Sequence, residues 1–331
     1  MKVLVTGGCG YIGSHTAVLL LEQGMEVVIV DNLSNSKIDV LDKIKKITGK
    51  DVIFYEEDVC NKEALDEIFK KEKIDAVIHF AGLKAVGESV LVPLKYYQNN
   101  LISTLNLLEI MEKHEVYKLV FSSSATVYGS PKSLPIKEDF PLKTTNPYGS
   151  TKLMIEEILK DLYKANLKFD ITILRYFNPI GAHKSGLLGE DPNGIPNNLM
   201  PYIVKVATAK LPVLNIFGND YDTVDGTGVR DYIHVLDLAN GHLLALKNEN
   251  PGLKIYNLGT GKGTSVLELV KTFEKVNNVS IPYKIAPRRD GDVASCYASS
   301  EKAFKELGFK CQYDITSMCK DSYNFVVTKE N

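Results

Sequence analysis

Short apolar runs alternate with longer stretches of helical spacing through the first half of the chain. The apolar runs are nearly continuous in Val, Ile and Phe, which is typical of strands that are covered on both faces. They predict six strands, at Lys2–Thr6, Glu26–Asp31, Val52–Asp58, Ala76–Ala81, Lys118–Ser122 and Phe169–Leu174. The helical pattern predicts four helices between them, at Ile12–Gln23, Lys62–Lys71, Pro93–Lys113 and Pro147–Asn166.

This alternation indicates right-handed strand–helix–strand crossovers and therefore a doubly wound parallel α/β sheet. After about residue 180 the pattern becomes less regular, and Gly, Pro and Asn are dense between Gly181 and Pro201. We predict a first domain over residues 1–178 and a smaller α/β C-terminal region over 179–331 that binds the substrate. The pattern allows some of the later segments to return to the first domain.

Three glycines follow the first predicted strand, Gly7, Gly10 and Gly13, in the spacing GxxGxxG. Glycine permits a tight turn and lets the backbone approach a pyrophosphate, and the helix N-terminus at Tyr11 and Ile12 offers N–H groups to that anion. A glycine triplet alone is weak evidence, and the alternative is a structural turn. The position between a strand and a helix favours a dinucleotide site.

An acid ends each of the next two predicted strands. Asp31 comes 18 positions after Gly13, where a carboxylate accepts hydrogen bonds from the adenosine ribose and repels a 2′-phosphate. No Arg occurs in residues 32–36, so the sequence favours NAD over NADP. Asp58 is placed to meet the adenine amine; the alternative is that it caps the following helix.

Two Tyr-x-x-x-Lys pairs occur in the chain. Gly129 and Pro131 interrupt the first pair, Tyr128 and Lys132, and argue against a helix there. The second pair, Tyr148 and Lys152, follows Pro147, a residue favoured in the first turn of a helix. Tyr148 and Lys152 are therefore predicted to project from one face, one turn apart.

This pair predicts acid–base chemistry coupled to hydride transfer. A free phenol titrates near pH 10, but a nearby ammonium and the positive nicotinamide ring favour its phenolate form. Tyr148 can then take the proton of a substrate hydroxyl while hydride leaves the same carbon for NAD⁺. Ser124, at the end of a predicted strand, is placed to hold the substrate oxygen and relay the proton. For Ser122 and Ser123 the sequence favours ordinary strand-end hydrogen bonds.

Composition narrows the possible partners. The chain has 331 residues, enough for two domains, and a formal net charge of −2 with interspersed signs, so neither nucleic acid nor a membrane is expected as a partner. A phosphorylated ligand then requires local cations. The five cysteines are scattered and predict reduced thiols in a cytoplasmic protein without zinc. We expect no signal peptide and no membrane span.

The glycine triplet, the acid after the second strand, and Ser124 before the helical Tyr148–Lys152 pair together resemble the extended short-chain dehydrogenase/reductase family, whose cofactor domain is of the Rossmann type. Long segments are more specifically similar to its UDP-hexose 4-epimerases. These segments are Thr6–Thr16, Asp31–Lys37, His79–Val90, Phe121–Gly129, Leu174–Ala182, Glu190–Tyr202, Ile216–Tyr221 and Asp225–Val235.

The resemblance implies a reversible interconversion of UDP-galactose and UDP-glucose, through a transient 4-keto sugar and bound NADH, in a homodimer formed by helices of the cofactor domain. Tyr148, Lys152 and Ser124 would be catalytic. The implied NAD contacts are Gly7, Gly10, Tyr11, Ile12, Gly13, Asp31, Asn32, Asn35, Asp58, Val59, Phe80, Ala81, Lys84, Asn99, Tyr148, Lys152 and Tyr176. The implied substrate contacts are Lys84, Ser124, Tyr148, Phe177, Asn178, Asn198, Leu199, Asn215, Phe217, Arg230, Arg289, Asp292 and Cys296.

Several alternatives remain open at this point. Arg230 and Arg289 would hold the diphosphate, since Arg forks suit phosphate oxygens; alternatively each pairs with a neighbouring acid, Asp231 or Asp290. Some relatives carry Tyr at the position of Cys296, and the smaller side chain predicts that N-acetylated sugars are also accepted. The rival functions are a nucleotide-sugar 4,6-dehydratase and a non-catalytic NAD sensor. His79, His183 and His234 are predicted to be structural.

Overall fold

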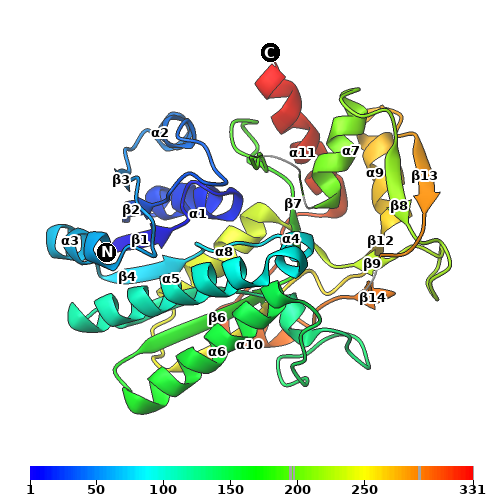
Figure 1. Cartoon of the computed structure of the whole chain (residues 1–331). Helices are drawn as coiled ribbons and strands as arrows, with labels where there is room; N and C mark the ends of the chain where they lie inside the picture. The colour runs from blue at the N-terminus through cyan, green and yellow to red at the C-terminus, as the bar shows by residue number, and fades with distance from the viewer. Residues whose placement is uncertain (194–195, 197, 290–291, 331) are drawn as a thin grey trace. The chain divides into compact units, whose positions relative to one another are not determined.

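A computed structural model of the protein describes residues 1–193, 196, 198–289 and 292–330. The chain forms two compact units, and each is discontinuous in sequence (Figure 1). The first unit consists of Met1–Gly129, Pro141–Tyr176 and Ala239–Tyr256. The second unit consists of Ser130–Phe140, Phe177–Leu238 and Asn257–Asn331.

A seven-stranded sheet forms the centre of the first unit, in the order β11-β6-β5-β4-β1-β2-β3. Its strands are β1 (Lys2–Thr6), β2 (Glu26–Val30), β3 (Ile53–Tyr55), β4 (Ala76–His79), β5 (Lys118–Ser124), β6 (Asp170–Tyr176) and β11 (Leu253–Leu258). The pairs among β1 to β6 are parallel. The order reverses direction at β1, as in doubly wound Rossmann sheets, so the predicted fold class is confirmed.

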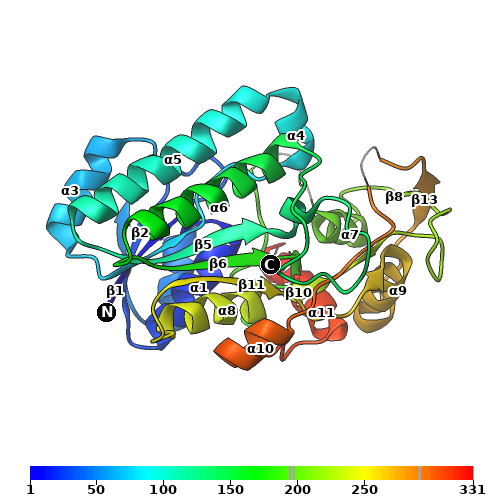
Figure 2. The ribbon, with the colours of Figure 1, turned by 90° about the horizontal axis from the view of Figure 1, so that it is seen from below.

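Helices cover both faces of this sheet (Figure 2). They are α1 (Tyr11–Glu22), α2 (Val40–Thr48), α3 (Lys62–Glu72), α4 (Val86–Leu91), α5 (Pro93–Lys113), α6 (Pro147–Ala165) and α8 (Val235–Lys247), with a 3₁₀ turn η1 at Ala125–Tyr128. Figure 2 shows α5 and α6 on one face and α8 on the other. Leu65 of α3, Leu107 of α5 and Leu159 of α6 join Val77 and Phe121 of the strands in one buried apolar cluster.

The sequence pattern placed the longest elements well and missed short ones. The predicted strand Lys2–Thr6 and the predicted helix Pro93–Lys113 have the observed bounds. The third strand ends at Tyr55, not at Asp58 as predicted. Helices α2 and α4 and strand β11 were not predicted.

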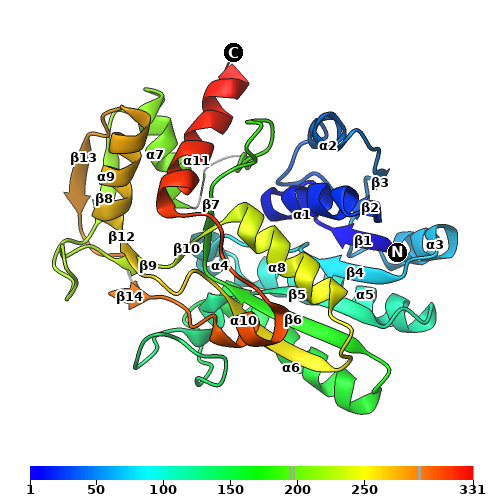
Figure 3. The same ribbon diagram turned by 180° about the vertical axis from the view of Figure 1, so that it is seen from behind.

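The described residues of the second unit form small sheets and several helices (Figure 3). β7 (Asn178–Ile180) pairs with β10 (Tyr232–His234), and β8 (Leu214–Phe217) pairs with β13 (Tyr283–Ala286). β9 (Val229–Arg230) lies between β12 (Thr264–Ser265) and β14 (Ser295–Cys296). The helices are α7 (Leu199–Ala207), α9 (Val266–Asn277), α10 (Glu301–Leu307) and α11 (Ile315–Glu330).

One apolar core holds the second unit together. Ile203 of α7, Phe273 of α9 and Met318 of α11 are buried against Leu214 and Ile216 of β8. Among the described residues, no helix has both the length and the apolar character that a membrane span requires.

Candidate active site

The three glycines form the turn from β1 into α1. Gly7 has φ +69°, a conformation that glycine adopts most readily, and its N–H donates to the Val30 carbonyl at 2.8 Å. A Cβ on Gly13 would lie 2.4 Å from the Gly7 carbonyl oxygen, so a side chain there cannot fit. Gly10 is the N-cap of α1 and leaves that helix end without a side-chain cap. The first turn of a helix attracts anions, so the turn fits a dinucleotide phosphate.

Asp31 lies beside this turn. Its Oδ2 accepts a hydrogen bond from the Cys9 N–H at 2.9 Å, and its Oδ1 accepts from the Leu33 N–H and the Ser36 hydroxyl at 3.0 and 2.8 Å. The carboxylate is therefore held against the glycine turn, at the carboxyl end of β2, where the acid of a Rossmann site meets the adenosine ribose.

Asp58 is not the cap of the next helix, so that alternative was wrong. The N-cap of α3 is Asn61, whose side chain accepts from the Ala64 N–H. Asp58 Oδ2 instead accepts from the Asn32 side chain at 3.0 Å. Two predicted cofactor residues, Asn32 and Asp58, thus lie together after β2 and β3.

The remaining predicted cofactor residues of the first unit lie in loops at the carboxyl ends of the strands or on α5. A Cβ on Gly7 would meet the Ala81 nitrogen at 2.9 Å, which places the chain after β4 against the glycine turn. Val59 is buried, Phe80 is partly buried, and Asn35 and Lys84 are exposed. Asn99 on α5 donates a hydrogen bond to the Asn100 side chain at 3.0 Å.

Tyr148 and Lys152 project from the first two turns of α6, as their spacing predicted. The helix is capped by Asn146, whose side chain accepts from the Gly149 N–H at 2.8 Å, and Pro147 follows the cap. Tyr148 is 9% exposed and Lys152 is 5% exposed. Lys152 Nζ donates to the Ser122 carbonyl at 2.7 Å. The two helical side chains are therefore fixed next to the end of β5.

Burial dominates the titration of both groups. It raises the pKa of Tyr148, and a hydrogen bond with the Ser124 side chain opposes that rise. Burial lowers the pKa of Lys152 to about 8, and the Glu156 carboxylate opposes that fall. Lys152 was expected to lower the pKa of Tyr148. In the protein alone desolvation outweighs any such effect, because the phenol is deeply buried.

The surroundings of Tyr148 are completed by Tyr176, a predicted cofactor residue, and by three residues for which no role was predicted, Ala85, Tyr96 and Thr126. Ala85 and Tyr96 form a buried cluster with it. Thr126 Oγ1 donates to Ser124 Oγ at 3.0 Å. On β6, the Tyr176 hydroxyl is hydrogen-bonded to Ser122 Oγ at 2.5 Å. No spacing rule links these residues, because different elements bring them together.

In the second unit two arginines share one carboxylate. Arg289 Nε donates to Asp292 Oδ2 at 2.8 Å, and Arg230 Nη2 lies 3.4 Å from Asp292 Oδ1. The Arg289 guanidinium lies over the Phe217 ring, 5.2 Å from its centroid. Four predicted substrate residues are therefore connected: both arginines contact Asp292, and Arg289 also lies over the Phe217 ring, a combination that suits a nucleoside diphosphate.

The neighbouring acid Asp231 is not the partner of Arg230. Its carboxylate is buried and accepts from the Thr260 N–H at 2.8 Å, from the Thr260 hydroxyl at 2.6 Å and from the Ala298 N–H at 3.0 Å. Asp290, the alternative partner of Arg289, lies outside the described residues. Both arginines are paired, but with Asp292.

The other predicted substrate residues lie on several elements of the second unit. Cys296 on β14 is the register partner of Arg230 on β9. Asn198 is the N-cap of α7 and donates to Glu190 at 2.6 Å, and Leu199 begins that helix. Asn178 Nδ2 donates to the Asp231 carbonyl at 3.2 Å. Phe177 is buried, whereas Asn215 on β8 is exposed.

Three histidines, His79, His183 and His234, have polar side chains as partners. His79 is hydrogen-bonded to the Thr6 and Thr104 hydroxyls at 2.7 and 3.1 Å, and His234 lies 3.1 Å from Asp321. His183 is hydrogen-bonded to Ser185. The part of the chain that the structure describes contains no group of three or more potential metal ligands.

Sequence comparison places the chain among nucleotide-sugar enzymes. Residues 4–322 match the family described as GDP-mannose 4,6 dehydratase. The chain is 59% identical, over 100% of its own length and 98% of the relative's, to a protein of Bacillus subtilis (strain 168) named UDP-glucose 4-epimerase.

Solved structures are also similar to this chain over almost its whole length. A UDP-glucose 4-epimerase from Bifidobacterium longum, crystallised with NAD⁺ and UDP, is 54% identical with a TM-score of 0.97, covering 100% of this chain and 99% of that one. The UDP-Glc/GlcNAc 4-epimerase of Campylobacter jejuni is 38% identical with a TM-score of 0.86, covering 99% of each chain. The protein described here belongs to the UDP-glucose 4-epimerase family.

Proposed function

We propose that the protein interconverts UDP-galactose and UDP-glucose through a transient 4-keto sugar, with NAD as its resident cofactor. The observation that carries the proposal is the buried arrangement of Ser124, Tyr148 and Lys152 at the end of β5. A hydrogen-bonded phenol with a fixed ammonium nearby suits removal of a proton from a sugar hydroxyl.

The glycine turn and the loops after β2, β3 and β4 would hold NAD. Gly7, Gly10 and Gly13 allow the tight turn that would present backbone N–H groups to its pyrophosphate, and Asp31 would accept from its ribose hydroxyls. When bound, NAD supplies a hydride acceptor and donor, and the positive charge of its oxidised ring favours a nearby phenolate.

Beside the hydride chemistry of NAD, the side chains of the protein move one proton and hold the nucleotide of the substrate. Tyr148 takes the proton of the sugar 4-hydroxyl and later returns it, and Ser124 relays it through the existing hydrogen bond. Lys152, held by the Ser122 carbonyl, supplies the positive charge that the phenolate needs. Arg230 and Arg289 anchor the diphosphate while the keto sugar turns about its link to it.

The dehydratase named by the matched family is the nearest rival. Elimination of water needs a further acid and base after Ser124, and the next residues are Ala125 and Thr126. Purified protein incubated with UDP-galactose, without added reductant, tests the proposal: UDP-glucose is the expected product. A 4-keto-6-deoxy product would support the dehydratase instead, and an unchanged sugar would support a non-catalytic NAD-binding role.

We infer that N-acetylated UDP-sugars are also interconverted, because Cys296 presents a small side chain beside the arginine pair. The Campylobacter jejuni relative, which has the same fold, is named for activity on both UDP-Glc and UDP-GlcNAc, which supports this inference. Conversion of UDP-N-acetylglucosamine by the purified protein is expected. Good activity on UDP-galactose with no conversion of either acetamido sugar would contradict the inference.

A homodimer is supported by an exposed apolar stripe on the first unit. Leu94, Ile102 and Leu105 of α5 are 74%, 43% and 42% exposed, and Met154 of α6 is 44% exposed. Exposed apolar patches of this kind commonly mark protein interfaces. Ile102→Glu should shift the protein to a monomer in analytical ultracentrifugation, whereas Leu167→Glu, at an exposed turn, should not. The five free thiols favour a cytoplasmic location for this assembly.

A further inference from the structure

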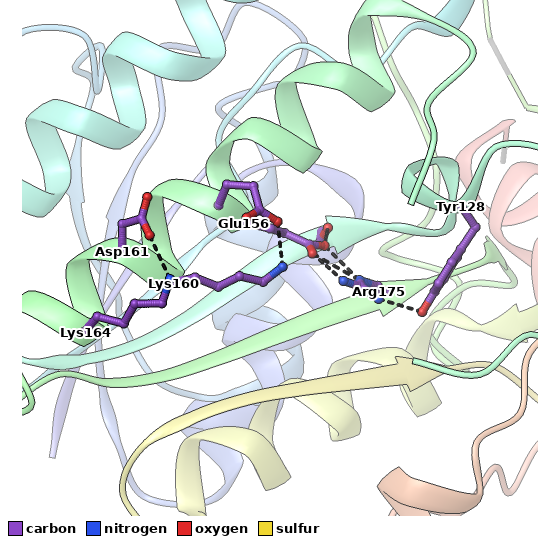
Figure 4. Close-up of polar contacts among 8 residues, drawn as sticks. Tyr128, Glu156, Lys160, Asp161, Lys164 and Arg175 are labelled. Carbon is purple, nitrogen blue, oxygen red and sulfur yellow. Dashed lines mark hydrogen bonds and ion pairs between the residues drawn. The ribbon is translucent and has the colours of Figure 1, made fainter. Parts of the chain in front are cut away.

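Two opposite charges lie in the core of the first unit, and the proposed reaction does not use them. Arg175 of β6 is 1% exposed and Glu156 of α6 is 0% exposed. Arg175 donates to both carboxylate oxygens of Glu156, through Nη2 at 2.5 Å and Nε at 2.9 Å. Figure 4 shows the guanidinium between Glu156 and the Tyr128 hydroxyl. Removing such charges from water is costly, so a buried pair is weak evidence for stability alone.

The pair is attached to the strand end that carries the proposed site. Ser123 Oγ donates to Glu156 Oε1 at 2.5 Å, and Ser123 is the register partner of Arg175. On either side of Ser123, the Ser122 carbonyl accepts from Lys152 and Ser124 is hydrogen-bonded to Tyr148. The carboxylate therefore fixes the middle residue of the segment that orients both proposed catalytic side chains.

Glu156 also lies one helical turn after Lys152, on the same face of α6. The charged and titratable groups around Lys152 and Tyr148 are Glu156 of α6, His79 of β4, Tyr96 of α5, and Arg175 and Tyr176 of β6. Burial lowers the pKa of His79 to about 3 and raises the pKa of both tyrosines, so these three are neutral near pH 7. Glu156 is the carboxylate that acts on Lys152, and a second carboxylate, Glu88 of α4, accepts a hydrogen bond from the Tyr96 hydroxyl at 2.7 Å.

We propose that Glu156, paired with Arg175, is a positioning residue: it fixes the Ser122–Ser124 strand end and keeps Lys152 in its ammonium form. The inference rests on the epimerase function proposed above. Removing the carboxylate charge should let Lys152 lose its proton at lower pH. A role in folding alone would not move that pH.

The test compares the pH profile of kcat in the NAD-loaded protein and its Glu156→Gln variant. Gln keeps the size of the side chain and removes its charge. We expect the upper pH limit of activity to fall by about one unit, which is roughly a tenfold loss of kcat above that limit. A folded Glu156→Gln protein with the parental pH limit would overturn the proposal.

Two further variants separate charge from geometry. Ser123→Ala removes a hydrogen bond to Glu156 and keeps both charges, so its upper pH limit should stay in place. A shift as large as that of Glu156→Gln would contradict the role of the charge. The double variant Glu156→Gln/Arg175→Gln also removes the guanidinium that the single variant leaves unpaired, and it serves as the test if the single variant does not fold. The double variant should show a smaller shift in the same direction, and an unmoved limit would overturn the proposal.

A measurement without substrate distinguishes failure of this inference from failure of the proposed function. The ¹³C chemical shift of Lys152 Cε, assigned by its loss in Lys152→Met, reports the ammonium directly. It should titrate about one unit lower in Glu156→Gln than in the parent. If Lys152 titrates about one unit lower in Glu156→Gln than in the parent, but the parent does not interconvert UDP-hexoses, the proposed function is refuted and the inference about Glu156 is not. If the Lys152 pKa is the same in the parent and in Glu156→Gln, the inference about Glu156 is refuted and the proposed function is not.

Discussion

The Nζ atom of Lys152 lies over the ring of Phe121, 4.9 Å from its centroid. The ring face attracts the ammonium, and the Ser122 carbonyl accepts a hydrogen bond from it. Neither contact offsets the loss of hydration, since burial still lowers the pKa of Lys152 to about 8. The first unit therefore holds a charge at neutral pH that its own interior disfavours.

Lys152 should make stability depend on pH. Its pKa is about 8 in the folded protein and near the ordinary 10.5 in the unfolded chain. Between these values the unfolded chain binds more protons, so the free energy of unfolding should rise as pH increases from 8 to 10.5. The full rise is about 3 kcal/mol.

Urea unfolding at several pH values measures this effect. Lys152→Met should lack the rise and should be more stable than the parent at pH 7, although it is inactive. Lys164→Met, at a side chain that is 74% exposed, is the matched control and should keep the parental curve. If the free energy of unfolding of the parent and of Lys152→Met changed with pH in the same way, burial would not disfavour the Lys152 ammonium.

Tyr148→Phe should abolish most turnover while keeping NAD. The phenyl ring fills the same buried site, but it cannot accept the sugar proton, so kcat should fall by roughly 10²- to 10⁴-fold. Product formation from UDP-galactose gives the rate, and absorbance of the purified protein gives the NAD content. Turnover equal to the parent's would remove the phenol from the mechanism.

Gly13→Ala should impair NAD binding and stability together. The added Cβ would lie 2.4 Å from the Gly7 carbonyl oxygen, so the glycine turn must move away from α1. Gly87→Ala is the matched control, because no atom lies within 4 Å of its added Cβ. Calorimetric titration with NAD should show weaker binding only for Gly13→Ala. If both variants bind like the parent, the turn does not hold the cofactor.

Cys296→Tyr should narrow the substrate range. A ring beside Arg230 would occupy the space assigned above to the acetamido group, so conversion of UDP-N-acetylglucosamine should be lost. Conversion of UDP-galactose should change little. Cys296→Ser, which keeps the volume, serves as the control. Equal acetamido activity in Cys296→Tyr and the parent would place the selective residue elsewhere.

The elements that the sequence predicted correctly are those whose length and apolar pattern are clear within one segment of the chain. Helix α5 begins at Pro93 and continues for 21 residues, long enough for its apolar period to be clear. Strand β1 is apolar from Val3 to Val5 and is bounded by the glycine turn. Helix α2 has nine residues with Ile44 as its one buried member, and such a short pattern is easily missed.

The local geometry of the candidate site could be predicted for the same reason, while the roles of its residues stay predictions. The glycine spacing and the Tyr148–Lys152 interval are local, and the structure places them as expected. The Glu156–Arg175 pair joins residues 19 positions apart on two elements, so only the fold reveals it. One local sign existed, since Glu156 is four residues after Lys152, but that spacing alone is common on helices.

The return of Ala239–Tyr256 to the first unit has a consequence for synthesis. This segment supplies β11, the edge strand beside β6. The ribosome must therefore translate most of the polypeptide before the first unit can be completed. A nascent chain stopped after Tyr176 would leave the flank of β6 open, as a strand edge on which chaperones or other growing chains can act.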